Sequence, residues 1–130
     1  MEDRFRRQGM FSWQELLTDD VETSKHFYAK LLGWSFQEFP TEGGGAYWVV
    51  KVGKNQVGGI MKAPPEAAGV PSSWGIYITV DDVDASERKA LDLGAKTVVR
   101  PTNIPGVGRF AVLADPRGAV FSIITYIADR

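Results

Sequence analysis

Side chains that could do acid–base or metal chemistry are few in this sequence. Two pairs of adjacent aspartates, Asp19-Asp20 and Asp81-Asp82, have the composition of a catalytic carboxylate pair. Each pair, however, lies between an apolar run and a helical stretch, where aspartate accepts hydrogen bonds from the free N–H groups of a helix start. We therefore predict that both pairs cap helices.

The other candidates lack the partners that their chemistry would need. His26 is the single histidine and the chain has no cysteine, so a disulfide, a thiolate metal site and a cysteine nucleophile are all excluded. His26 stands beside Phe27 in a predicted helix, where we expect a solvated imidazole. Ser122 has no histidine to act as its base, so a serine nucleophile is not expected. The segments Gly43-Gly44-Gly45 and Gly106-Val107-Gly108 are not followed by helices, which argues against a dinucleotide site.

Composition indicates a globular chain of one domain's length. The 130 residues include 44% hydrophobic and 24% charged residues, and the formal net charge is −1. This balance favours neither nucleic acid nor a membrane surface as a partner. The N-terminal residues carry no apolar signal core, and no run approaches the ~20 apolar residues of a membrane helix, so we expect a cytoplasmic protein. The basic cluster Arg4-Phe5-Arg6-Arg7 is expected to belong to a short mobile leader.

The elements that position these side chains occur twice along the chain. Trp13 to Val21 and Gly75 to Val83 are each a strand-like run that ends in an aspartate pair. Each is followed by a helical stretch that stops near Gly33 or Gly94, and a left-handed glycine commonly ends a helix. The distance from valine to glycine differs by one residue between the copies. The two copies agree in how the predicted helix starts, in its apolar face and in where it ends, which indicates an internal duplication.

Three strand candidates follow each predicted helix. After the first helix they are Trp34 to Phe39, Ala46 to Val52 and Gln56 to Met61, with turns at 40–45 and 53–55. After the second they are Lys96 to Arg100, Arg109 to Ala114 and Ala119 to Tyr126, with turns at 101–108 and 115–118. A linker rich in Pro, Ala and Gly, 63–73, joins the copies. The predicted fold is α+β, a single domain over 1–130 with βαβββ modules at 10–62 and 74–127 and helices on the outer face.

Three groups of residues carry a resemblance to a known family. They are Thr18-Asp19-Asp20-Val21…Phe27-Tyr28…Leu32-Gly33-Trp34, Val80-Asp81-Asp82-Val83…Leu93-Gly94-Ala95 and Asp115-Pro116-Arg117-Gly118. These segments resemble the vicinal oxygen chelate superfamily, which includes glyoxalase I, extradiol dioxygenases, and fosfomycin- and bleomycin-resistance proteins. The resemblance covers Phe11 to Tyr126. It implies two βαβββ modules that form a cupped mixed sheet with a ligand inside, and a homodimer, because relatives of this fold commonly pair.

The resemblance also implies where a metal would be held. Enzymes of the superfamily usually bind one divalent metal through His, Gln or Glu side chains on four inner strands. Transferred by spacing, those positions fall at Trp13, about Gly59, about Gly75 and Ser122. None of these is a typical ligand, and zinc or iron sites need several imidazole, thiolate or carboxylate donors. We therefore predict neither a metal nor another cofactor.

Strand alternation proposes which side chains line the cup of the implied fold. In the fifth strand Ile76, Ile78 and Val80 share the face expected under a helix, so the alternate residues face the interior. The candidate ligand-binding residues are Trp13, Glu15, Tyr77, Thr79, Ser122 and Tyr126. This mixture suits a small organic ligand with an apolar or planar body. The glycines at 59 and 75 favour an open space, although the three aromatic residues could instead fill the interior as core.

Glu15 is the single catalytic candidate, because a carboxylate on an apolar face is costly to bury unpaired. It is either solvated at the mouth of the cup or paired with Arg109, or else it binds a basic ligand group or accepts a proton. Three functions are left open by these residues. They are a metal-free binder of a small molecule, a lyase-like or dioxygenase-like enzyme with an atypical site or with Glu15 as base, and a structural module whose cup is self-filled. We favour the first.

Overall fold

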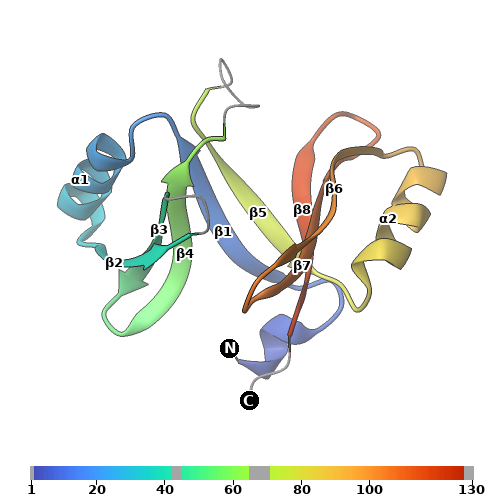
Figure 1. Ribbon diagram of the computed structural model, residues 1–130, viewed down its shortest axis with the longest axis horizontal. Helices are drawn as coiled ribbons and strands as arrows, with labels where there is room; N and C mark the ends of the chain where they lie inside the picture. Colours follow the sequence, from blue (N-terminus) through green and yellow to red (C-terminus); the bar gives the residue numbers. More distant parts are fainter. Residues whose placement is uncertain (1, 42–44, 65–70, 128–130) are drawn as a thin grey trace. The chain divides into compact units, whose positions relative to one another are not determined.

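The order of helices and strands follows the duplicated pattern (Figure 1). A computed structural model describes residues 2–41, 45–64 and 71–127 of the chain. In chain order the elements are η1 (Asp3–Arg6), β1 (Phe11–Thr18), α1 (Val21–Leu32), β2 (Ser35–Pro40), β3 (Ala46–Val52), β4 (Asn55–Lys62), β5 (Ser73–Thr79), α2 (Val83–Asp92), β6 (Lys96–Ile104), β7 (Gly108–Ala114) and β8 (Val120–Tyr126). Each α-helix is preceded by one strand and followed by three, so the predicted α+β fold and the βαβββ order are confirmed.

The aspartate pairs cap the two α-helices. Asp20 accepts a hydrogen bond from the backbone N–H of Thr23 at 3.0 Å, and Asp82 accepts one from that of Ala85, also at 3.0 Å. The chain leaves α1 through Gly33, whose φ of 73° lies in the left-handed region that glycine adopts without steric cost. The prediction that one aspartate of each pair caps its helix is therefore confirmed.

The chain divides into two compact units, and their boundaries differ from those of the sequence modules. Unit 1 is Met1–Trp13 with Ile76–Arg130, and unit 2 is Gln14–Gly75. Residues that precede the first module therefore belong with the second one.

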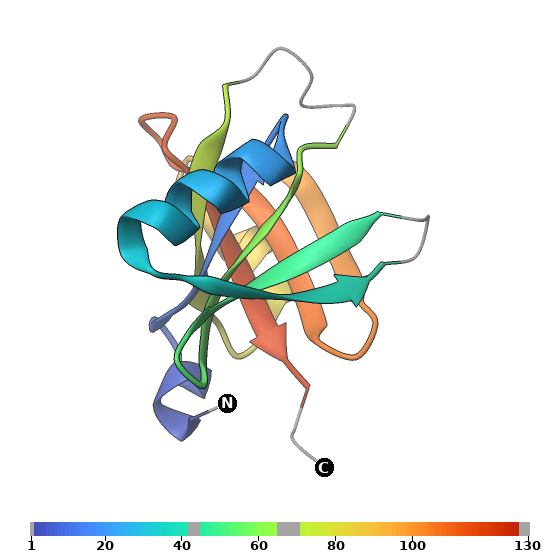
Figure 2. The same ribbon diagram turned by 90° about the vertical axis from the view of Figure 1, so that its left-hand side faces the viewer.

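Unit 2 holds the first helix and its strands. Its strand order is β2-β3-β4-β1, with β1 parallel to β4 and the other neighbours antiparallel. The helix α1 lies across one face of this sheet (Figure 2), and its side chains pack with a core of Leu16, Val50 and Ile60. Trp34 and Trp48 pack against the same core. Burial of these apolar groups is what holds the helix to the sheet.

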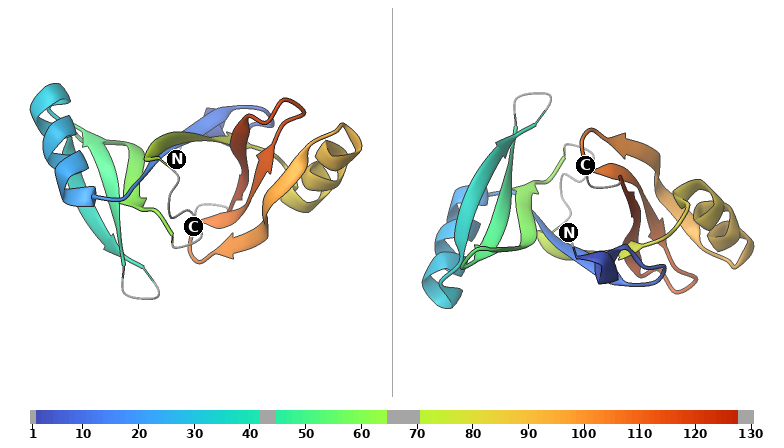
Figure 3. Two further views of the ribbon diagram at one scale, coloured as in Figure 1. Left: turned by 90° about the horizontal axis from the view of Figure 1, so that it is seen from above. Right: turned by 90° about the horizontal axis from the view of Figure 1, so that it is seen from below.

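Unit 1 repeats this arrangement with the strand order β5-β8-β7-β6, in which β5 is parallel to β8. The helix α2 lies along one face of its strands (Figure 3), over a core that includes Val80, Val83, Leu113 and Ile123. Ile123 belongs to this core and is the register partner of Ile78, so Ile78 lies on the α2 side of β5. Val80 belongs to the core itself, so the predicted helix-side face is correct for these two residues. Ile76 is an exception, since it is 38% exposed and lies outside that core.

The N-terminal segment, residues 2–10, does not form the mobile leader that the basic cluster predicts. It contains η1 and bonds to β5, where the Gly9 N–H donates to the Thr79 carbonyl and the Thr79 N–H donates to the Met10 carbonyl, both at 2.8 Å. Arg6 Nη1 donates to the carbonyl of Ile127 at 2.8 Å. These bonds tie the segment to the ends of β5 and β8.

The strand β6 is longer than predicted, because Pro101 does not end it. The strand continues to Ile104, and its register with β7 shifts between Thr97 and Val99 and again between Val99 and Thr102. Proline has no N–H to donate to a neighbouring strand, but it is tolerated at a bulge of an edge strand such as β6. The predicted turn over 101–108 is therefore restricted to the residues between β6 and β7.

Two predicted features fall outside the described residues. They are Gly43-Gly44 of the first glycine run and positions 65–70 of the linker. Neither α-helix of the described part is long and apolar enough to cross a membrane.

Candidate functional site

Tyr77, Ser122 and Tyr126 lie on neighbouring strands of unit 1. Tyr77 on β5 and Ser122 on β8 are register partners, so their side chains share the sheet face opposite α2. Both are 9% exposed, and the Tyr77 ring lies 6.4 Å from that of Phe110, centroid to centroid. Tyr126 ends β8 and is half-buried. The structure therefore brings together the predicted site residues of these two strands.

Thr79 is almost fully buried at the end of β5. Its hydroxyl donates to the backbone carbonyl of Phe5 in the N-terminal segment. This side chain therefore has a structural partner, and its contact with a ligand stays a prediction.

Trp13 and Glu15 lie on β1 and are both half-buried, and the boundary between the units falls between them. Glu15 is the register partner of Gly59 on β4. Arg109, which we considered as a partner of Glu15, bonds to Asp84 and Asn103 of its own unit. Its pairing with Glu15 stays a prediction.

Gly59 does not leave the open space that its small size suggests. A Cβ atom added at Gly59 would lie 1.8 Å from the hydroxyl oxygen of Tyr47, so the Tyr47 ring occupies that position. At Gly75 the nearest atom would be the Glu15 carbonyl oxygen at 3.9 Å, an ordinary contact. The sequence analysis did not select Tyr47. Trp48 packs against the core under α1, so its neighbour Tyr47 lies on the opposite face of β3, toward which a side chain at position 59 would point.

The residues at the implied metal positions do not fit a metal ion. Among Trp13, Gly59, Gly75 and Ser122, a single side chain carries an oxygen donor. Across residues 2–41, 45–64 and 71–127, no three His, Asp or Glu side chains converge in a way that could hold an ion. His26 is exposed on α1, as predicted.

A groove of about 510 Å³ opens in unit 1 beside the first turn of α2. Its volume falls within the roughly 300–1,000 Å³ of small-molecule sites. The lining residues are Asp81, Asp82, Val83, Asp84, Asn103, Ile104, Gly108, Arg109, Thr125, Tyr126 and Ile127. Tyr126 is thus both a predicted site residue and part of an actual hollow.

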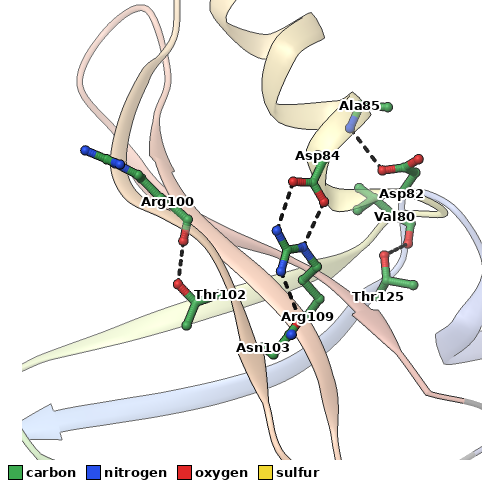
Figure 4. Close-up of polar contacts among 9 residues, drawn as sticks. All are labelled: Val80, Asp82, Asp84, Ala85, Arg100, Thr102, Asn103, Arg109 and Thr125. Carbon is green, nitrogen blue, oxygen red and sulfur yellow. Dashed lines mark hydrogen bonds and ion pairs between the residues drawn. The ribbon is translucent and has the colours of Figure 1, made fainter.

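Arg109 is held in one orientation on the wall of this groove (Figure 4). Its Nε and Nη2 donate to the two carboxylate oxygens of Asp84 at 2.8 and 3.0 Å, and its Nη1 donates to Asn103 Oδ1 at 2.9 Å. Hydrogen bonding to Arg109 lowers the pKa of Asp84, and the same bonds raise the pKa of Arg109. The pair connects α2 to β7 and fixes the guanidinium by a two-point contact.

We expect Asp84→Asn to destabilise the protein at neutral pH but not in strong acid. The pKa of Asp84 in the folded state is below the ordinary value of 3.8, so its contribution is present above that value and is lost as the pH falls through the folded pKa. Thermal unfolding of wild type and variant from neutral pH down to about pH 2 checks this expectation. Asp92→Asn, an exposed position at the end of α2, is the control. A difference between wild type and Asp84→Asn that stayed constant over this range would contradict the expectation.

The hydroxyl of Tyr126 is positioned by Ser12. The two hydroxyl oxygens are 2.8 Å apart, and Ser12 Oγ is also 3.5 Å from the carbonyl oxygen of Tyr77. Burial raises the pKa of the Tyr126 phenol, which is therefore neutral at physiological pH. Sequence reasoning did not select Ser12, because alternation puts it on the opposite face of β1 from Trp13 and Glu15.

A second hollow, of about 380 Å³, lies on the α1 side of the unit 2 sheet and contains none of the predicted site residues. It is lined by Gln14, Trp34, Val50, Val52, Val57, Gly58 and Trp74. Trp74 Nε1 donates to the Tyr28 hydroxyl at 3.0 Å, and Trp34 stacks on the Tyr28 ring with centroids 5.2 Å apart. These contacts fix the two indoles that wall the hollow.

Comparison with known proteins gives one family and a set of relatives. The family model described as "Glyoxalase-like domain" matches residues 14–124. The putative glyoxylase CFP32 of Mycobacterium bovis is 42% identical over 116 residues, which are 89% of this chain and 44% of the relative. The anthracycline biosynthesis protein DnrV of Streptomyces peucetius is 31% identical over 127 residues, covering 88% of this chain and 46% of the relative. The chain thus spans about half the length of the curated relatives it matches.

Solved structures share the fold at low sequence identity. Methylmalonyl-CoA epimerase from Mycobacterium tuberculosis matches with a TM-score of 0.66 and 14% identity, covering 94% of this chain and 93% of that one. The hypothetical protein BH1468 from Bacillus halodurans matches with a TM-score of 0.72 and 11% identity, covering 95% and 99%. At such identities the likeness is one of fold alone.

Proposed function

Because the chain belongs to the glyoxalase-like domain family, within the vicinal oxygen chelate superfamily, we propose that it binds a small organic molecule without the metal usual in that superfamily. The observation that carries the proposal is the groove of about 510 Å³ in unit 1. On it, Arg109 is held by Asp84 and Asn103, and Ile104 and Ile127 supply apolar lining. A few fixed polar groups among apolar walls are what a small-molecule site requires.

The names of the relatives suggest the kind of molecule. One group is named a putative glyoxylase, and another is named for anthracycline biosynthesis. Anthracyclines are planar polycyclic compounds, and a planar body also suits the aromatic residues predicted for the site. We therefore propose a planar organic ligand for the unit 1 groove, whose lining includes one residue of the predicted site, Tyr126.

An enzyme that uses Glu15 as a proton acceptor is the second candidate function. The observation that favours it is local to unit 2, where Glu15 is half-buried and paired in register with Gly59. The Tyr47 hydroxyl occupies the position of the missing Gly59 side chain, next to Glu15 across the ladder. A carboxylate beside a phenol can accept and return a proton without a metal. Glu15→Gln separates the candidates, because it removes the base and keeps the shape.

The test of the binding function is a thermal-shift screen with a panel of planar compounds that includes the anthracycline doxorubicin. At a ligand concentration of about 100 times Kd, binding stabilises the folded state by about 2.7 kcal/mol. Asn103→Trp puts an indole into the groove from an exposed position on its rim and should abolish the shift. Thr102→Trp is the matched control, because Thr102 is the exposed neighbour that does not line the groove.

Three outcomes would count against the proposal. If no compound stabilises the wild type, the reading of a self-filled structural module takes its place. If Asn103→Trp retains the shift, the ligand binds elsewhere. If elemental analysis of protein purified without chelator finds about one Zn, Ni or Fe per chain, the metal-free part of the proposal is wrong.

A further inference from the structure

Three neighbouring strands of unit 1 place a row of polar side chains on the side of the sheet that α2 covers. Asn103 on β6 is the register partner of Arg109 on β7, which is in turn the register partner of Thr125 on β8. Arg109 alternates with Ala111 and Leu113, which belong to the core under α2, so the row shares their face. All three residues of the row line the groove of about 510 Å³.

The Arg109 guanidinium lies in this groove, because both residues that it bonds to, Asp84 and Asn103, line the groove as well (Figure 4). The N–H groups of a guanidinium point outward in its plane. The bonds from Nε and Nη2 to Asp84 and from Nη1 to Asn103 therefore occupy the edge of the group and neither of its flat faces. Partners on α2 and on β6 fix this plane, and 37% of the side chain is exposed.

The flat faces of this guanidinium carry no ring from the described residues. Within the part of the chain that the structure describes, Arg109 has no cation–aromatic contact, whereas Lys25 of unit 2 lies 3.1 Å from the centre of the Trp48 ring. A guanidinium is flat and delocalised, so it stacks on the face of an aromatic ring, which a lysine ammonium cannot do. A ring that a ligand brings into the groove can therefore stack on Arg109.

The charges around Arg109 narrow the class of ligand. Asp84 balances the guanidinium, and Asp81 and Asp82 add two further carboxylates to the lining. These carboxylates repel an anionic ligand, and an anion that competed for the same N–H groups would have to displace Asp84. A neutral ring that stacks on the flat face leaves all three hydrogen bonds of Arg109 in place.

We propose that Arg109 determines the specificity of the groove: its guanidinium face stacks on a flat, electron-rich, neutral ring, which the groove prefers to a saturated ring with the same carbon skeleton. This inference rests on the proposed function, because it takes the unit 1 groove as the ligand site. The bonds to Asp84 and Asn103 contribute because a side chain that is already fixed loses little freedom when a ring stacks on it.

The preference is tested with naphthalenemethanol and decalinmethanol, which share a carbon skeleton and a hydroxyl group. The first is flat and aromatic, and the second is saturated. Wild type should bind the flat compound about three- to tenfold more tightly, the worth of one cation–aromatic contact at a partly exposed site. A groove that recognises apolar area alone would bind the saturated compound at least as tightly. NMR titration of the full chain measures both dissociation constants.

Arg109→Lys keeps the positive charge and removes the flat face, so it should lose the preference for the aromatic compound. Arg100→Lys is the matched control, because Arg100 is an exposed residue of β6 that does not line the groove. This control should keep the wild-type preference. Melting curves of both variants establish that each is folded at the temperature of the titration.

The contact can also be observed in wild type, so the test stays decisive if Arg109→Lys does not fold. The Nε–Hε signal of Arg109, assigned through its side chain, is expected to exchange slowly with water because this N–H bonds to Asp84. An aromatic ring stacked on the guanidinium shifts the signal through its ring current, and a saturated ring has no such current. Naphthalenemethanol should therefore move the signal far more than decalinmethanol does.

Two kinds of failure can be told apart. Equal affinities in wild type, a preference that survives in Arg109→Lys, or an Nε–Hε signal that the flat compound leaves in place would each overturn the inference. The proposed function would still stand in these cases, because the groove binds a small molecule. If neither compound binds wild type, the proposed function fails for this ligand class and the inference fails with it.

Discussion

Leu113→Ala is expected to lower the free energy of unfolding by about 2–5 kcal/mol, the usual range for emptying a buried leucine site. Leu113 on β7 is 1% exposed and belongs to the core under α2, with Val80, Val83, Ala111 and Ile123. Deleting its isobutyl group removes apolar burial and leaves a cavity, because close-packed neighbours collapse only in part. Urea unfolding followed by tryptophan fluorescence measures the effect.

The matched control is Leu93→Ala in the same unit. Leu93 follows α2 and is 69% exposed, so the same chemical change removes little burial. Its effect should stay within about 0.5 kcal/mol. A loss at Leu113 no larger than at Leu93 would mean that α2 is not held by this core.

Gly108→Ala is expected to destabilise the protein by about 1–3 kcal/mol, although it adds a single methyl group. A Cβ at Gly108 would lie 2.0 Å from the carbonyl oxygen of Thr125 and 2.9 Å from the Cα of Tyr126. Both obstacles are backbone atoms of β8, so no side chain can rotate away. The register pair Gly108–Tyr126 must move apart. The variant should therefore lose stability and also weaken the ligand binding proposed for the groove that Gly108 lines.

The control for this change is Gly75→Ala, whose Cβ would meet its nearest atom at 3.9 Å. Gly75 does not have a positive φ, so the alanine fits without strain. Its effect on stability should be within about 0.5 kcal/mol. Equal melting temperatures for Gly108→Ala and wild type would show that β7 and β8 separate more easily than their pairing suggests.

Features decided by neighbours in the chain could be predicted from the sequence. Asp20 and Asp82 cap their helices because a carboxylate three residues before an N–H reaches it in any helix start. Gly33 ends α1 because its conformation is local too. The order of helices and strands along the chain followed from the repeat itself, since the second copy supported each element of the first.

Features decided by contacts between distant segments could not be predicted. Pro101 indicated a turn, and only the pairing with β7 shows that a bulged last strand accommodates it. The basic cluster indicated a free leader, because the residues that hold it, Thr79 and Ile127, are far away in the sequence.

In the candidate site, too, locally determined features could be predicted and features that depend on distant contacts could not. Alternation along a strand correctly placed Tyr77 and Ser122 on one face, because that pattern depends on local geometry. It could not show that the Tyr47 ring fills the space at Gly59 or that Ser12 reaches Tyr126. Both facts depend on the register between strands, which the periodic pattern of one strand does not contain.

The bond from Arg6 to Ile127 joins residues 121 positions apart, and this separation bears on how the chain is made. When a ribosome has released residue 75, every segment of unit 2 is available, so its sheet can pair as a contiguous piece. Residues 2–10 are made before β5 and β8 and yet find their partners last, because those strands complete their contacts. A segment made before all of unit 2 is thus among the last to become ordered.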